Sequence, residues 1–208
     1  MSEINLPAIL VAHLITVASV GPSTLAIAGT SMMHGRRSGL ILASAMACGS
    51  ATWSVAAAMG LSAIMLANAW VSEVMRYLGA AYLLFLAYKS LRSMFSKKDL
   101  ATNPIAGSAA QLFAKGLLLH LTNPKAILFF GALFSIGVPV GSPVQSLAMV
   151  VVAMALQSMI IFVCYAFMFS MPSMTRHYLG LRRWFEGAFA FGFGAAAFKV
   201  LTARLTPT

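Results

Sequence analysis

The sequence predicts an all-α integral membrane protein, with six transmembrane helices arranged as two inverted three-helix repeats. The first observation behind this is composition: 60% of the 208 residues are hydrophobic and only 9% are charged. Because soluble domains carry roughly 25% charged residues, this chain lacks the polar surface that a globule in water needs. The second observation is a series of long apolar stretches, and the third is a proline break near the start of each half.

The apolar stretches are long enough to cross a bilayer one after another. A spanning helix needs about 20 residues with few charges. The six predicted spans cover residues 6–30, 40–66, 71–88, 112–136, 144–171 and 184–201, of which the third and the sixth are short. The sequence "NAW" at 68–70 and the Gly/Pro-rich "GVPVGSP" at 137–143 predict tight turns. The expected partner of such a chain is the lipid bilayer.

Positive charge gathers beside every second loop. Ten of the 14 Lys and Arg residues lie in or near the loops after the first, third and fifth spans: Arg36, Arg37, Lys89, Arg92, Lys97, Lys98, Lys115, Arg176, Arg182 and Arg183. By the positive-inside rule these loops are cytoplasmic and both termini lie outside, although Lys199 and Arg204 argue mildly the other way. Since topology explains the net charge of +10, no nucleic-acid partner is expected.

Six spans divide into two halves, residues 1–93 and 112–208, joined by a cytoplasmic connector at 94–111. An odd number of spans in each half gives the halves opposite orientations. Each half opens with a proline-interrupted span, at Pro22 and at Pro124, and closes with a short one. Broken helices in corresponding positions of two such halves indicate a secondary transporter with its site at the breaks.

The two prolines change which backbone groups need partners. Proline lacks an N–H and clashes with the carbonyl four residues earlier, so Pro22 frees the carbonyl of Ala18 and Pro124 frees that of His120. Within lipid, such groups must find protein or water. The breaks therefore present helix N-termini that suit a carboxylate and carbonyl ends that suit an ammonium, as in a zwitterion. A plain proline kink that shapes packing is the alternative.

The candidate substrate-binding residues surround these breaks. They are Gly21, Pro22, Ser23 and Thr24 at the first break and His120, Asn123, Pro124 and Lys125 at the second. Lys125 lies too far from the nearest predicted helix end for its stem to reach the interface. A charge so deep is expected to face a cavity or a partner. His120 either relays a proton, bonds the freed backbone or packs in the core.

Other chemistry finds little support in the sequence. Cys48 and Cys164 form no Cys-x-x-Cys pair and are expected to be small buried side chains. No set of histidines and carboxylates has metal-ligand spacing, and neither a Gly-x-Ser-x-Gly motif nor a phosphate-binding loop occurs. We therefore expect no enzyme, metal or cofactor. His13 is expected to be a hydrogen-bonded polar residue within the first span.

Four stretches, taken in order and register, resemble the LysE/RhtB family of amino-acid exporters. They are "VGPSTLAIAGTSMMHGRRSGL" at 20–40, "GAAYLLFLAYKSLR" at 79–92, "KGLLLHLTNPKAILFFGALF" at 115–134 and "RRWFEGAFAFGFGAAAFKVL" at 182–201. The resemblance implies a six-span, multi-pass permease of the bacterial inner membrane. It also implies export of amino acids or close derivatives by proton-motive-force-driven alternating access, with the site residues at the two breaks.

Two departures from the family pattern bear on the substrate. Val20 stands where many members have a proline, and Ser50 follows Gly49 where many have an aspartate. No acidic residue lies deep in any predicted span, which favours neutral or modified amino acids over cationic ones and leaves the coupling ion open. The alternatives are an exporter of metal or other inorganic ions on a related architecture and a membrane enzyme or thiol-electron carrier. The sequence also leaves a homo-oligomer open.

Overall fold

The fold is a bundle of helices, as expected of an all-α membrane protein. The computed structural model describes residues 4–67, 69–96, 102–139 and 141–202, and no strand occurs among them. The helices are α1 (Leu6–Ala18), α2 (Pro22–Ala67), α3 (Ala69–Met94), α4 (Ala109–Leu121), α5 (Pro124–Gly137), α6 (Val144–Phe169) and α7 (Pro172–Thr202). By length and composition α2, α6 and α7 can each cross a membrane, and α4 with α5 forms a fourth candidate span, bent by 53°.

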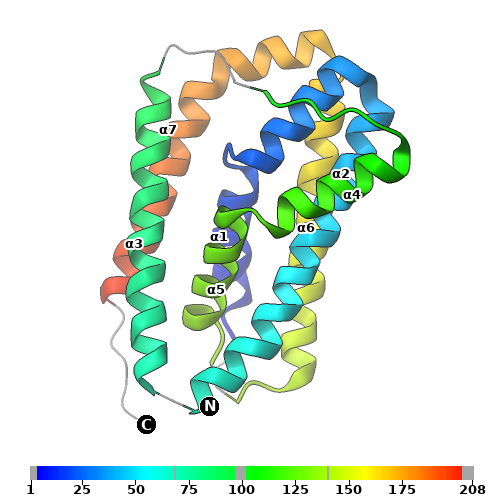
Figure 1. The fold of residues 1–208 in the computed structure, drawn as a ribbon. Coiled ribbons are helices and arrows are strands. Elements are labelled where there is room, and N and C mark those ends of the chain that lie inside the picture. Colours follow the sequence, from blue (N-terminus) through cyan, green and yellow to red (C-terminus); the bar gives the residue numbers. More distant parts are fainter. Residues whose placement is uncertain (1–3, 68, 97–101, 140, 203–208) are drawn as a thin grey trace.

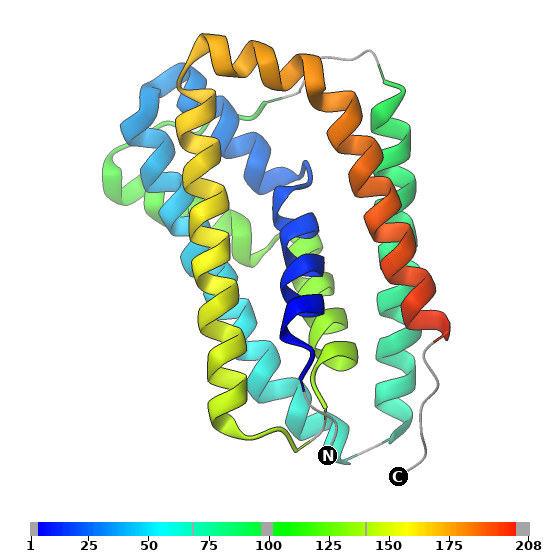
Figure 2. The ribbon, with the colours of Figure 1, turned by 180° about the vertical axis from the view of Figure 1, so that it is seen from behind.

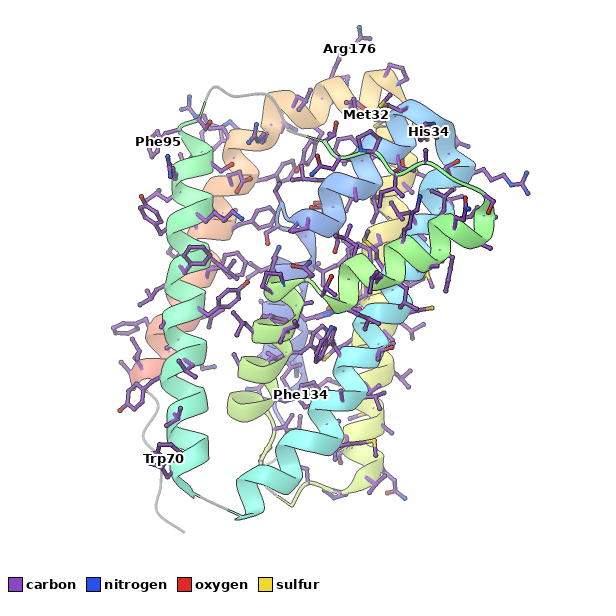
Figure 3. All side chains as sticks on the ribbon, viewed as in Figure 1. Met32, His34, Trp70, Phe95, Phe134 and Arg176 are labelled. Atoms are coloured by element: carbon purple, nitrogen blue, oxygen red, sulfur yellow. The ribbon has the colours of Figure 1, made fainter. Side chains whose placement is uncertain are left out.

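The ends of the helices sort to two opposite ends of the bundle. The corner of α2, the segment 102–108 and the junction of α6 with α7 lie at one end, whereas α2 meets α3 and α5 is followed by α6 at the other (Figure 1). The view from behind shows the same two groups of connections at opposite ends (Figure 2). His34 and Arg176 lie at the first of these ends and Trp70 at the second (Figure 3). Lys97, Lys98 and Arg204, which entered the charge argument, lie outside the described residues.

A single glycine connects the first two predicted spans. α2 is 46 residues long but turns at Gly35, whose φ of 78° and ψ of 175° belong to a region that only glycine adopts readily. The first span was expected to end at residue 30, and "HGRRSG" was expected to form a polar loop. Instead the helix continues to Gly35 and resumes directly after it, so that the polar residues around this corner are helical.

The third span is not short, contrary to expectation, and the helix that contains the sixth span begins well before residue 184. α3 has 26 residues and α7 has 31. Residues 173–183, expected to be a loop, form the first part of α7, which lies across one end of the bundle (Figure 1). Arg176 and His177 are exposed on this part, while Thr175 and Tyr178 are buried, which is typical of an interfacial amphipathic helix. The connector was predicted at 94–111. α3 ends at Met94 and α4 begins at Ala109, so the segment between the two helices is 95–108.

The core lies between helices that are distant in sequence. α2 packs most extensively on α6, and α3 on α7. Cys48 and Cys164 lie on the outer surface of this bundle, so the prediction that both are buried is wrong. A helix that is apolar all round carries no sequence signal for which face meets lipid and which meets protein. Asn68, within the predicted 68–70 turn, lies outside the described residues.

Candidate functional site

The first break separates α1 from α2 by residues 19–21. Because Pro22 has no N–H to offer, the carbonyl of Ala18 needs a partner from elsewhere, and it accepts a hydrogen bond from the Tyr165 hydroxyl of α6. The backbone N–H of Gly21 donates to Thr24 Oγ1 over 2.8 Å, which satisfies one of the amides at the start of α2. Two helix ends of opposite polarity therefore face one another across three residues.

The second break separates α4 from α5 at residues 122–123. Asn123 is the N-cap of α5: its Oδ1 accepts from the Lys125 backbone N–H at 3.0 Å, and Pro124 takes the first helical position, where no N–H is needed. The carbonyl of His120 accepts from the Asn123 N–H at 3.2 Å. The carbonyl that Pro124 frees and the Lys125 N–H thus find their partners within the break itself.

Lys125 joins the two breaks. Its Nζ donates to the carbonyl of Ser19 at 2.8 Å and to Ser19 Oγ at 2.6 Å. The ammonium therefore lies at the C-terminal end of α1, where the helix dipole carries partial negative charge. Gly21 leaves the room for it, since a Cβ there would stand 3.2 Å from Lys125 Cδ and 3.3 Å from Nζ. The expectation that this lysine faces a partner inside the protein agrees with these contacts.

A second set of contacts links the breaks through Ser23. Ser23 Oγ lies 2.9 Å from His120 Nδ1, and Asn123 Nδ2 donates to the same oxygen at 3.2 Å. All three side chains are buried. The breaks lie side by side near the middle of the bundle although about a hundred residues separate them in sequence (Figures 1 and 2).

A small cavity lies between the breaks. Six of the eight candidate residues line it, namely Gly21, Ser23, Thr24, His120, Asn123 and Lys125. Pro22 and Pro124 shape the backbone but are not on its wall. Its volume is about 30 Å³, enough for one or two water molecules.

Sequence reasoning missed part of the cavity wall. The additional polar residues are Thr16, Ser19 and Ser50, and the aromatic ones are Phe129, Phe130 and Phe162. Ser19 could have been found from its place at the end of α1, directly before the predicted break. The three phenylalanines come from α5 and α6. Nothing in the sequence distinguishes them from the phenylalanines that face lipid.

Comparison of the sequence with known proteins identifies its family. The family described as LysE type translocator matches residues 14–204, which include both breaks. The chain belongs to this family. The threonine efflux protein of Salmonella typhi is 32% identical over 190 residues, covering 88% of this chain and 91% of that protein. The leucine efflux protein of Klebsiella pneumoniae is 30% identical over 164 residues, covering 78% and 76%. No solved structure matched the chain.

In this LysE type translocator, a chain of polar side chains reaches the cavity from α6 and α1. His13 Nδ1 lies 2.6 Å from Gln157 Oε1, and its Nε2 lies 3.2 Å from Ser158 Oγ. Ser158 Oγ is in turn 2.8 Å from Ser50 Oγ on the cavity wall. His13 is thus hydrogen-bonded at both nitrogens, as predicted. Within the described part of the translocator, no group of three or more His, Cys, Asp or Glu side chains could hold a metal ion.

Proposed function

We propose that this translocator exports amino acids across the bacterial inner membrane by alternating access around the two breaks, driven by proton motive force. The observation that carries the proposal is the meeting of two broken helices at a polar cavity, with Lys125 of one break bound to Ser19 of the other. Half-helix ends of this kind bind charged substrates in secondary transporters. The similarity to threonine and leucine efflux proteins supports amino acids as the substrate class.

The proposed carrier has six spans in two inverted halves, with the domain limits 1–93 and 112–208. Its first span is α1 with the first part of α2, and its fourth is α4 with α5. The pairing of α2 with α6 and of α3 with α7 supports this arrangement, because these pairs join corresponding spans of the two halves. The positive loops are assigned to the cytoplasm and both termini to the outside.

The substrate is proposed to bind as a zwitterion. Its ammonium would take the place of the Lys125 ammonium at the Ser19 carbonyl, and its carboxylate would then pair with the released lysine. An amino acid is several times larger than a water molecule, so a cavity of about 30 Å³ must open before one can enter. This requirement fits a carrier that alternates between states.

The cavity wall favours substrates without a positive side chain. Among its described residues there is no carboxylate, and the polar groups are hydroxyls, an amide, an imidazole and one ammonium. A cationic side chain would meet Lys125 with no compensating charge, which is costly in a buried site. We therefore propose neutral amino acids, such as those with small polar or aliphatic side chains, as the exported class.

Efflux from cells tests the function and the site separately. Cells that express the translocator and matched cells that do not are loaded with a panel of amino acids, and the medium is assayed over time. We expect faster efflux of one or more neutral amino acids, and we expect Lys125→Ala to slow it about tenfold or more through loss of a charge-assisted contact. Lys115→Ala is the control, since Lys115 is exposed and its ammonium bonds, among the described residues, only the carbonyl of Ala106.

Equal efflux from both kinds of cell across the whole panel would contradict amino-acid export. Normal efflux by the Lys125→Ala variant, with export otherwise established, would instead show that the two breaks do not form the substrate site.

A further inference from the structure

A ring nitrogen of His120, a residue of the cavity wall, stands out in the part of the chain that the structure describes. His120 is only 5% exposed and lines the cavity, yet its Nε2 has no hydrogen-bond partner among the described residues. Buried polar atoms in folded proteins are nearly always paired, and one that is not needs an explanation. Whether this nitrogen donates or accepts decides what could bind to it, and the surrounding hydrogen bonds answer that question.

The amide of Asn123 is oriented by the backbone. A backbone N–H can only donate, and the Lys125 N–H points at the Asn123 side chain at 3.0 Å. The oxygen of that amide must therefore face Lys125, which turns its nitrogen toward Ser23. Asn123 Nδ2 accordingly donates to Ser23 Oγ, at 3.2 Å.

The Ser23 hydroxyl determines which nitrogen of His120 carries the proton. Its oxygen accepts from Asn123, and its hydrogen finds its acceptor in His120 Nδ1, 2.9 Å away. A neutral imidazole that accepts at Nδ1 carries its proton on Nε2. The opposite tautomer would leave two unpaired groups instead of one, the Ser23 hydrogen and the Nε2 lone pair. A doubly protonated ring would add a second buried positive charge beside Lys125, which is unfavourable.

The ring is also held in place by packing. A Cβ on Gly49 would lie 3.0 Å from both Cβ and Cδ2 of His120, so the glycine of α2 allows the ring to lie directly against the backbone. On another side the Phe162 ring meets it edge-on, with 5.8 Å between ring centroids. The Nε2–H is therefore a fixed donor rather than one that turns away.

Two features beside the donor favour a negatively charged partner. Lys125 lines the same cavity, and the N-terminal ends of the two half-helices that begin at Pro22 and Pro124 flank it. An anionic acceptor suits such a place best.

We propose that His120 Nε2 donates a hydrogen bond to the carboxylate of the exported amino acid, and that Asn123 and Ser23 are positioning residues that keep the imidazole in its donor tautomer. The proposal rests on the proposed function, since it names the carboxylate subsite of that same cavity.

Two amide variants of His120 test this with opposite expectations. In His120→Gln the amide nitrogen reaches the position of Nε2, whereas in His120→Asn it reaches the position of Nδ1 beside Ser23. The probes are L-threonine and L-threoninol, which lacks the carboxylate, each competing with labelled L-threonine for counterflow in proteoliposomes. We expect His120→Gln to keep most of the wild-type preference for L-threonine over L-threoninol. We expect His120→Asn to reduce that preference about tenfold to a hundredfold, the effect of one charge-assisted hydrogen bond.

A purely structural role for His120, holding Ser23 in place, predicts the reverse order, and an equal or greater preference in His120→Asn would overturn the proposal. Nitrogen-15 NMR of the histidine rings in the wild-type protein gives a test that needs no functional variant. It should find Nδ1 of His120 without a proton, and a protonated Nδ1 would also overturn the proposal. If the wild-type protein transports no amino acid at all, the proposed function fails instead, and the two failures are thereby distinguished.

Discussion

The first and second breaks interrupt their helices with the same residue type but satisfy the freed backbone in different ways. At the second break Asn123 caps α5 and its own N–H satisfies the carbonyl of His120. At the first break the carbonyls of Ala18 and Ser19 depend on Tyr165 of α6 and Lys125 of α5. Hydrogen bonds within one break are kept when neighbouring helices move, whereas hydrogen bonds from other helices change when those helices move. If substrate binds between the breaks as proposed, the first break is the one suited to respond to it.

The largest expected effect comes from filling the space that Lys125 uses at the first break. In Gly21→Val the added methyl groups would overlap the Lys125 side chain, because even a Cβ would stand 3.2 Å from its Cδ. The ammonium would be driven from Ser19, and we expect efflux to fall more than about tenfold. Gly131→Val is the matched control, since no atom of the described residues lies within 4 Å of a Cβ there. Unchanged efflux in Gly21→Val would mean that Lys125 need not reach Ser19.

The next largest effect is expected from removing the hydrogen bond between Tyr165 of α6 and the first break. Tyr165→Phe removes the hydroxyl that bonds the Ala18 carbonyl and leaves a part-buried acceptor without this partner. We expect a loss of about 1–3 kcal/mol in the free energy of unfolding, measured by thermal unfolding in detergent. Hydrogen exchange should quicken at residues 18–25 and stay unchanged at 120–127. Tyr88→Phe, at an exposed tyrosine, should change neither. Faster exchange at both breaks alike would remove the distinction between them.

The smallest effect is expected at the cap of the second break. Asn123→Ala removes the N-cap of α5, for a loss of about 1 kcal/mol in the free energy of unfolding. Asn123→Ser should recover most of it, because serine caps nearly as well as asparagine. If Asn123→Ser is as unstable as Asn123→Ala, capping is not what holds this break together, and its contact with Ser23 is the more important one.

The breaks could be predicted from the sequence because proline acts locally. Gly21-Pro22 and Asn123-Pro124 fix where the helices stop, and the match between two halves indicated that these places meet. The partners of the freed groups could not be predicted in the same way. Tyr165 and Ala18 are 147 residues apart, and an apolar helix such as α6 gives no periodic signal for the face that it turns inward. The same lack of contrast explains the wrong expectation for Cys48 and Cys164.

The corner at Gly35 has a mechanical consequence. The helical segment that follows the first break runs into the long arm of α2 through one residue, with no loop between them. A flexible loop would absorb a shift of the helical segment before Gly35, whereas a connection of one residue transmits most of such a shift. If substrate binding tilts this short segment, as the proposed function requires, the tilt would pass through Gly35 to the long part of α2 and to α6, on which α2 packs. In that case Gly35 would couple a change at the proposed site to a movement of α2 and α6 together.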